Sequence, residues 1–310
     1  MKTIDTRYLA KKWGDKLRGF IINFCIAVIL IGTSYIILTP ILSSLSHAFM
    51  HHEDLRNPMI FMIPENFTLY NMRNAFEHMA YIQALTNTLI YSLGMALLHV
   101  LIGSLVGYGF ARFRVPGEKI LFIILITTIV VPVHAYIVPL FMQFRFFNIL
   151  GFEFNLISTY YPMILMTLGG VGLRSGLFIF IYRQFFRGLP KEIEEAALID
   201  GAGIFRTFFR VMLPNSLAPT LTVLLFSLVW HYNDMFYLGM LMPGTFLMPV
   251  ALTSLEWNYR WATAVTHSDW GQISLVMYAG VILVIAPVLT IYFLLQRYFL
   301  EGIERSGIVG

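Results

Sequence analysis

The stretch EEAALIDGAGIFRTFFRVMLP, Glu194 to Pro214, is a polar segment enclosed by two long apolar runs. The run before it covers residues 156–182, and the run after it covers 216–242. Acidic side chains gather at the start of the segment, two glycines lie in its middle at 201–203, and arginines follow. This order predicts two short helices joined by a tight turn, displayed between membrane spans.

The first short helix is expected to cover about ten residues that end before Gly201. Pro190 suits the first helical turn, and Glu192, Glu194 and Glu195 lie where the helix dipole favours negative charge. Gly201 supplies the stop, because a helix often ends at a left-handed residue open mainly to glycine. A helix of this length is marginal alone in water, so it needs a partner surface.

The second short helix is predicted to be amphipathic and to end at Leu213 and Pro214. Its apolar face is expected to hold Ile204, Phe205, Phe208, Phe209 and Met212, opposite Arg206 and Arg210. The two helices then form either a protruding docking element or an interfacial helix that packs under the bundle. The residues alone leave both interpretations open.

The composition is that of an integral membrane protein. Of 310 residues, 58% are hydrophobic and 12% are charged, and the mean hydropathy is +0.73. Six apolar runs are long enough to cross the bilayer as helices, and they do not alternate as barrel strands do. The predicted spans are about 20–42, 85–111, 120–142, 156–182, 216–242 and 272–299. The expected fold is therefore all-α, a polytopic membrane domain over 20–299 with six transmembrane helices.

The basic residues set the expected orientation. All but five of the 21 lysines and arginines lie before the first span, in 112–119, in the polar loop 183–214 or near the C-terminus. Because cytoplasmic loops are rich in lysine and arginine, both termini are expected to be cytoplasmic. This placement explains the pI of about 9.1 without a nucleic-acid partner. Residues 1–19 are expected to be an amphipathic lead-in on the inner leaflet, and 300–310 a cytoplasmic tail.

Several chemistries have no support in the sequence. No phosphate-binding loop motif is present, so no nucleotide site is expected, and the single cysteine, Cys25, allows no internal disulfide. The first apolar run is too long for a cleavable signal peptide, so we expect it to be retained. HHED at 51–54 has metal-ligating residue types, but adjacent ligands on an exposed loop rarely converge, so no metal and no cofactor is expected.

Two predicted spans contain residues that interrupt helices. Pro132 and Pro139 in the third span predict a kink, since proline removes a backbone donor. Four glycines in LGGVGLRSG, residues 168–176 of the fourth span, permit either close helix packing or a locally unwound backbone around Arg174.

A candidate substrate path is expected within the spans. Arg174 is costly in the bilayer and should face a cavity, a partner subunit or the membrane edge. Span five holds a polar and aromatic cluster that is unsuited to lipid, and its members are Trp230, His231, Tyr232, Asn233 and Asp234. Core packing is the main alternative for this cluster. His99 and His134 are expected to be hydrogen-bonded core residues rather than ligands.

The polar segment resembles the signature of ABC-importer permeases. The matching positions are Glu195, Ala196, Ala197, Gly201, Val211, Leu213 and Pro214, with valine where that family more often has isoleucine. Further likeness to the second permease subunit of maltose-type carbohydrate importers lies in YRQFFRGLPKEIEEAALIDGAG, WHYNDMF, LLQRYFLEGIERSGIVG and PENFTLYNMRNAF. The resemblance therefore covers nearly the whole chain.

This resemblance implies a subunit with the type I importer permease fold in the bacterial cytoplasmic (inner) membrane. It implies a homologous second permease, two cytoplasmic ATPases that hydrolyse ATP, and an extracytoplasmic solute-binding protein, while the chain itself catalyses no reaction. By the same resemblance, the residues that couple to the ATPase are Glu195, Ala196, Ala197, Asp200 and Gly201. The expected cargo is a carbohydrate; alternatives are an ABC permease for a non-sugar small solute and a stand-alone secondary transporter.

Overall fold

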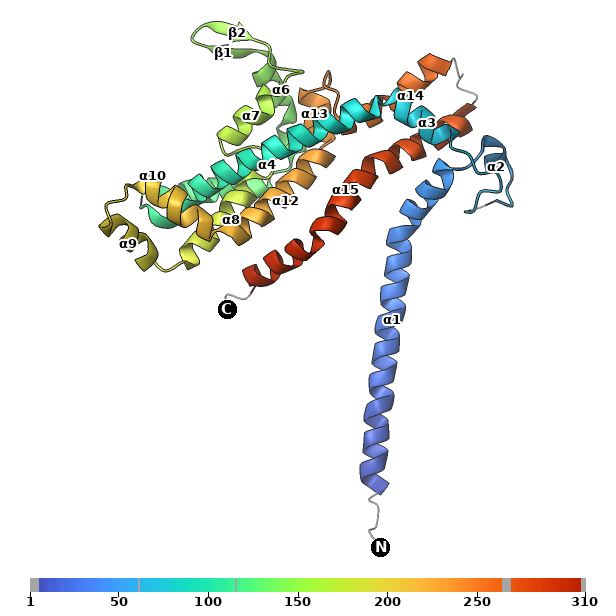
Figure 1. Ribbon diagram of the computed structural model, residues 1–310, viewed down its shortest axis with the longest axis horizontal. Helices are drawn as coiled ribbons and strands as arrows, with labels where there is room; N and C mark the ends of the chain where they lie inside the picture. The colour runs from blue at the N-terminus through green and yellow to red at the C-terminus, as the bar shows by residue number, and fades with distance from the viewer. Residues whose placement is uncertain (1–5, 61, 115, 264–268, 308–310) are drawn as a thin grey trace.

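The computed structural model describes the backbone of residues 6–60, 62–114, 116–263 and 269–307. Within these ranges it describes the side chains of residues 18–294 and 296. The chain is almost entirely helical, and its helices form an elongated bundle from which one long helix diverges (Figure 1). The expected all-α class is confirmed.

Three helices among the described residues are long and apolar enough to cross a membrane uninterrupted. They belong to α1 (Thr6–Ala48), α4 (Tyr81–Arg112) and α15 (Trp270–Gly307). A fourth candidate is a bent pair, Ile204–Asn215 followed by Leu217–Asn233, whose two parts meet at 80°. The first, second and sixth predicted spans thus correspond to α1, α4 and α15.

The other predicted spans are built from shorter helices. Span three consists of α5 (Glu118–Val130), the 3-10 turn η1 (Val133–Ala135) and α6 (Ile137–Arg145). Span four consists of α7 (Tyr161–Leu168) and α8 (Ser175–Gly188), and span five of α12 (Leu217–Asn233) and α13 (Phe236–Leu241). The breaks have local causes, because Pro132 precedes η1 and Gly170 has a φ of +71°. The expected kink in span three and the unwound alternative in span four are confirmed.

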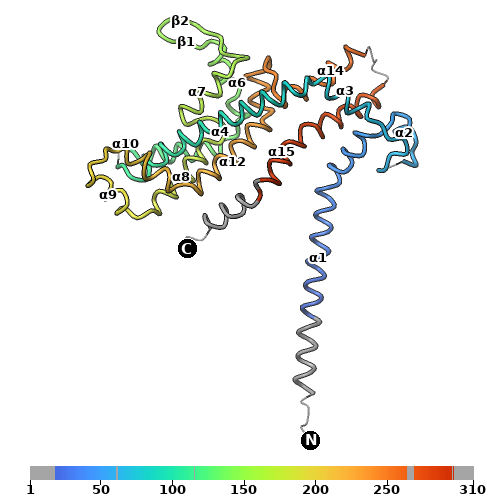
Figure 2. The backbone as a smooth tube through the Cα atoms, in the orientation of Figure 1, coloured from blue at the N-terminus to red at the C-terminus, as the bar shows by residue number. Residues whose placement is uncertain are grey.

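The ends of the chain differ from the expected lead-in and tail. The lead-in is continuous with span one, since α1 begins at Thr6 and no proline occurs before Pro40. The side chains of the lead-in up to residue 17 lie outside the described residues. Helix α15 likewise continues to Gly307, so the predicted tail is helical over most of its length, and residues 308–310 lie outside the description. Figure 2 shows the coloured part of α1 leaving the bundle near α2 and diverging from the other helices.

The segments between the spans on the expected outer side hold additional elements. They are α2 (His52–Arg56), α3 (Tyr70–His78), α14 (Met248–Thr263) and a hairpin of β1 (Phe147–Ile149) and β2 (Phe152–Phe154). The strands are antiparallel, with Phe147 opposite Phe154. At the start of α3, the Tyr70 backbone N–H donates to the Thr68 hydroxyl at 3.1 Å. The sequence analysis assigned no helix to α14.

Helix α4 is the centre of the bundle and packs most extensively against α8 and α12. Three apolar clusters lie along it: one toward α3, α14 and α15, one toward α6, α7 and α13, and one toward α8 and the start of α12. The closest approach to α8 is at Gly107, where an added Cβ would lie 2.6 Å from Tyr182 Cβ and 3.0 Å from the backbone of Arg183. A small residue is therefore required at this contact.

Gly107→Ala should destabilise the protein, because the new methyl group meets backbone atoms that cannot rotate away. Overpacking of this kind costs about 1–3 kcal/mol. Gly109→Ala is the matched control, since no described atom lies within 4 Å of a Cβ built there on the same helix. Thermal unfolding of the detergent-purified protein measures the effect; equal midpoints for the two variants would contradict the close packing of α4 and α8.

Candidate functional site

The first candidate site is the loop at one end of the bundle that holds α9 (Glu192–Ile199) (Figure 1). The helix has three acidic residues in its first turn and is followed by Gly201 with a φ of +81°. Both features agree with the sequence analysis, and the left-handed glycine confirms the expected stop. No described atom lies within 4 Å of a Cβ built on Gly201, so its constraint comes from the backbone conformation alone.

The second part of the loop is not the single amphipathic helix that the sequence analysis expected. Helix α10 (Ile204–Thr207) leads into a π-helical turn, η2 (Phe208–Met212), and then into α11 (Leu213–Asn215). The Leu213 N–H donates to the carbonyl of Phe208, five residues earlier. Pro214 follows, and it has no N–H to donate to the carbonyl four residues before it. The wider turn changes the direction of successive side chains.

The π-helical turn divides the expected apolar face into a buried and an exposed group. Phe208 and Met212 are buried against α4 and α8. Ile204, Phe205 and Phe209 are exposed, as are Leu198 and Ile199 of α9. We call these five residues the apolar loop surface. Ile199 is 85% exposed and Phe205 is 74% exposed. The prediction that all five apolar residues of the second helix share one face is therefore wrong.

A nearly buried ion pair ties the loop to α4. Arg112 Nε lies 3.0 Å from Glu194 Oε2, and the two side chains are only 6% and 14% exposed. The Tyr108 hydroxyl donates to Glu194 Oε1, and an Arg112 amino group donates to the Leu189 carbonyl at 3.0 Å. Sequence reasoning missed these contacts, because the partners are far apart in the chain, with 86 residues between Tyr108 and Glu194 in sequence number.

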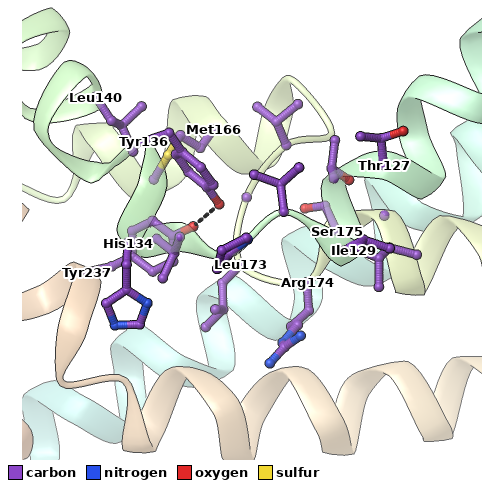
Figure 3. A pocket seen from close by; sticks show the side chains of 18 of the residues that line it. Thr127, Ile129, His134, Tyr136, Leu140, Met166, Leu173, Arg174, Ser175 and Tyr237 are labelled. Carbon is purple, nitrogen blue, oxygen red and sulfur yellow. Dashed lines mark hydrogen bonds between the residues drawn. The ribbon is translucent and has the colours of Figure 1, made fainter.

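The second candidate site is a cavity of about 750 Å³ at the broken parts of the third and fourth spans (Figure 3). Its lining includes His134, Tyr136, Arg174 and Tyr237, and apolar side chains of α5 and α6. The hydroxyls of Tyr136 and Tyr237 are 2.7 Å apart. Arg174 has a φ of +59° at the start of α8, and its side chain is exposed. Arg174 is thus an exposed residue of the cavity lining, a position compatible with each of its expected environments.

The predicted cluster of span five is divided among several environments. Trp230 meets the cavity residue Arg174, whose guanidinium carbon is 5.5 Å from the indole centroid. Asn233 is exposed, and its side-chain amide donates to Val229 at 2.9 Å. Asp234 Oδ1 accepts the first two backbone N–H groups of α13, each at 3.1 Å. Tyr232 is fully buried on another side and donates to the Val284 carbonyl of α15.

The two histidines that the sequence analysis weighed have different environments. His99 is a buried, hydrogen-bonded core residue as expected, with Nε2 3.0 Å from the Ser175 hydroxyl. His231, a member of the predicted cluster in span five, joins it through the Ser227 hydroxyl. His134 instead is exposed at the cavity, with its ring centroid 4.3 Å from that of Phe236. The expectation of a core position is wrong for His134, because η1 turns it out of the helix.

Comparison with known proteins gives a consistent result. Residues 99–305 match the family model described as the binding-protein-dependent transport system inner membrane component. The chain is 31% identical to the diacetylchitobiose uptake system permease protein of Streptomyces coelicolor, covering 90% of this chain and 86% of the relative. It is 27% identical to the maltodextrin transport system permease protein of Bacillus subtilis, covering 93% and 96%.

The fold has a counterpart among solved structures. A chain in the crystal structure of a bacterial ABC transporter involved in the import of the acidic polysaccharide alginate superposes with a TM-score of 0.71. The two chains are 19% identical, and the superposition covers 90% of this chain and 96% of the other. This likeness supports the ABC permease fold. The family match over residues 99–305 shows that the chain belongs to the binding-protein-dependent transport system inner membrane components.

Proposed function

We propose that this protein is the transmembrane permease subunit of an ATP-driven importer for an oligosaccharide. The observation behind the proposal is the apolar loop surface, which is exposed to solvent while its helix is bound to α4 by a nearly buried ion pair. Exposed apolar patches of this kind are typical of protein interaction sites. Relatives named for uptake of diacetylchitobiose, maltodextrin and arabinooligosaccharides support a saccharide as the cargo.

The partner at this loop is a cytoplasmic ATPase subunit. Ala196 and Ala197 keep α9 thin enough to enter a cleft, and Glu195 and Asp200 are exposed and can meet basic groups of the partner. When the ATPase cleft closes, α9 moves, and the contact of Glu194 with Arg112 passes the displacement to α4. ATP binding shifts the permease between inward-facing and outward-facing states only if the ATPase contacts differ between them.

The remaining partners follow from the family. A homologous second permease completes the translocation path, and a second ATPase and an extracytoplasmic solute-binding protein complete the complex. The protein lies in a bacterial inner membrane with both termini in the cytoplasm, the orientation that places the basic polar loop inside the cell. The exposed apolar length of α1 then contacts lipid or the second permease.

The substrate path runs along the cavity at Arg174. Arg174 and Trp230 offer a cation and an aromatic plane, while Asn233 and Asp234 add an amide and a carboxylate close by in sequence. Aromatic rings stack on sugar faces, and amides, carboxylates and guanidinium groups bind hydroxyls. Tyr232 supports this region from within the core, where it binds α12 to α15.

Reconstitution of the subunits in proteoliposomes tests the proposed function. The permease pair with its ATPase and binding protein should take up a labelled oligosaccharide only when ATP is present. Omission of the ATPase should abolish uptake. Uptake by the membrane subunits alone would instead make this protein part of a secondary transporter and contradict the proposal.

Gly201→Val should uncouple ATP hydrolysis from transport. A β-branched residue at positive φ costs about 1–3 kcal/mol, so the turn after α9 must change its path. Gly203→Val is the control, because Gly203 has an ordinary φ of −73° and open surroundings in the described structure. Substrate-stimulated ATPase activity and uptake are the measurements; equal coupling in both variants would count against the role of Gly201.

Glu194→Gln should lower the amount of substrate moved per ATP hydrolysed. The substitution leaves the nearly buried Arg112 without its counter-charge, a loss of about 1–3 kcal/mol that loosens α9 from α4. Glu192→Gln removes an equal charge from the same first turn at an exposed position and serves as the control. If the two variants transport equally well per ATP, the ion pair does not transmit movement.

Arg174→Gln should reduce uptake at least about fivefold, since a hydrogen bond to a charged group contributes about 1.5–3 kcal/mol. The variant keeps a long side chain at this backbone position, so it tests the charge. Arg145→Gln, an exposed arginine at the end of α6, is the control. Initial uptake rates over a range of substrate concentrations measure the effect, and an unchanged rate would remove Arg174 from the substrate path.

A further inference from the structure

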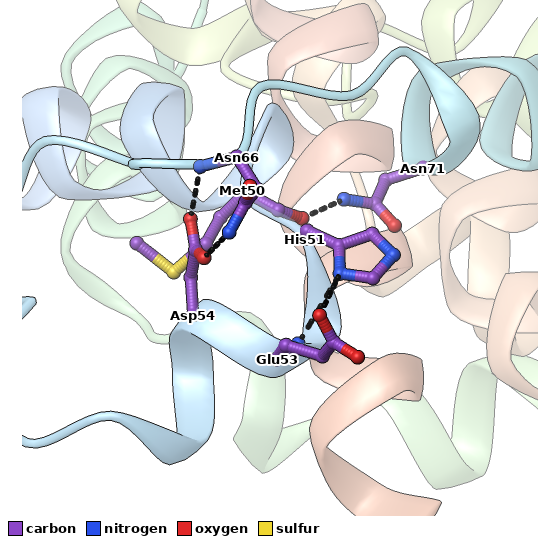
Figure 4. A network of polar contacts seen from close by, with 6 residues as sticks. All are labelled: Met50, His51, Glu53, Asp54, Asn66 and Asn71. Atoms are coloured by element: carbon purple, nitrogen blue, oxygen red, sulfur yellow. Dashed lines mark hydrogen bonds and ion pairs between the residues drawn. The ribbon is translucent and has the colours of Figure 1, made fainter.

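The turn at the start of α2 is held in place by a network of hydrogen bonds (Figure 4). Asp54 is buried and accepts from the Asn66 backbone N–H at 2.7 Å and from the Asn66 side chain at 2.6 Å. The buried Asn71 side chain donates to the Met50 carbonyl at 2.8 Å. The residues between Met50 and Asp54 therefore have a fixed backbone.

Three consecutive residues of this turn, His51, His52 and Glu53, direct their side chains toward one another. In a regular helix, successive side chains diverge by about 100°. His51 is the N-terminal cap, and its extended backbone, with φ −75° and ψ 151°, directs its ring back over the first turn. Its Nδ1 lies 3.7 Å from Glu53 Oε2, and its ring centroid is 4.3 Å from that of His52.

The convergence changes the expectation drawn from the sequence. One ligand atom from each of His51, His52 and Glu53 lies within 4.8 Å of the other two. The objection that adjacent residues rarely converge does not hold here, because only His52 and Glu53 are helical. Small side-chain rotations would bring the three atoms to a single ion, since zinc ligands lie about 2.0–2.2 Å from the metal.

Two of the three residues, His51 and His52, line a cavity of about 680 Å³ at the outer end of the bundle. Asp269, just before α15, and Arg56 lie on the same lining and carry opposite charges. Glu53 gives the cluster its own negative charge. The dipole of α2 opposes a cation, but this helix has only five residues, and a full carboxylate charge is larger than the partial charge of a helix end.

We propose that His51, His52 and Glu53 form a binding site for a late first-row divalent cation, with water completing the coordination. Two imidazoles and one carboxylate suit Zn²⁺ and disfavour Mg²⁺ and Ca²⁺, which take oxygen ligands. The site is on the outer side of the membrane in the expected topology, so external metal reaches it. This inference does not depend on the proposed transport function.

Calorimetric titration of the detergent-purified full-length protein with Zn²⁺ tests the site. The wild-type protein should bind one more equivalent than the His52→Ala variant, or bind it at least about tenfold more tightly. Removing a residue that only hydrogen-bonds to a metal ligand already lowers metal affinity about tenfold or more. Removing a ligand itself should lower the affinity at least as much. Glu53→Gln should show the same loss, while Mg²⁺ at equal concentration should not bind at this site.

Two controls separate the site from other zinc-binding groups. Glu65→Gln removes an exposed acid from the same outer loop, and His78→Ala removes an outer histidine outside the cluster; both should bind Zn²⁺ as wild type does. Zn²⁺ should raise the thermal midpoint of the wild type and of the controls more than that of His52→Ala, because a ligand stabilises only the state that binds it. Identical titrations and identical midpoint shifts for wild type and His52→Ala would overturn the proposal.

Discussion

Backbone hydrogen bonding inside a bilayer is the constraint on which the rest of this structure depends. Lipid offers no partners, so a helix that is interrupted within the membrane must direct its freed groups to protein or to a water-filled cavity. The interruptions at 131–136 and 169–174 both border the cavity at Arg174, and the one at 234–235 lies beside its Tyr237. The interruptions of the spans and the cavity thus occur together, because the backbone groups that the interruptions leave free lie at the cavity.

Asp234 illustrates how such a break is stabilised. Its carboxylate accepts two backbone N–H groups at the start of α13 and replaces the carbonyl partners that a continuous helix would have supplied. The same short helix holds Tyr237 against Tyr136 at the cavity wall. A residue that the sequence suggests as a substrate ligand therefore has a structural role, because it positions the helix that carries Tyr237 to the cavity wall.

Helix α4 links the two ends of the molecule. It is uninterrupted, it packs against both α8 and α12, and its last turn holds the Arg112 that binds Glu194 of the polar loop. A displacement of α9 therefore reaches the bundle through a rigid element rather than through a flexible connection. The π-helical turn at Phe208–Met212 also fixes the loop to the bundle, because Phe208 and Met212 are buried while Phe205 and Phe209 stay exposed.

The sequence by itself determined the membrane class, the three long apolar helices, the left-handed Gly201 and the interruption at Pro132, because these depend on local composition and backbone freedom. It left the stretch around Gly170 open between close packing and an unwound backbone. Only the tertiary structure decided which way side chains face. Trp230, Tyr232 and Asp234 are neighbours in sequence but point to a cavity wall, a helix interface and a helix start. The ion pair of Glu194 with Arg112 joins segments far apart in the chain, and the position of His51 over Glu53 depends on its conformation as a helix cap. The hydrophobic periodicity of the sequence indicates neither contact. The direction of each side chain depends on the rotation of its helix, and its contact partner comes from a segment far away in the chain. Both are fixed only when the helices pack into the bundle.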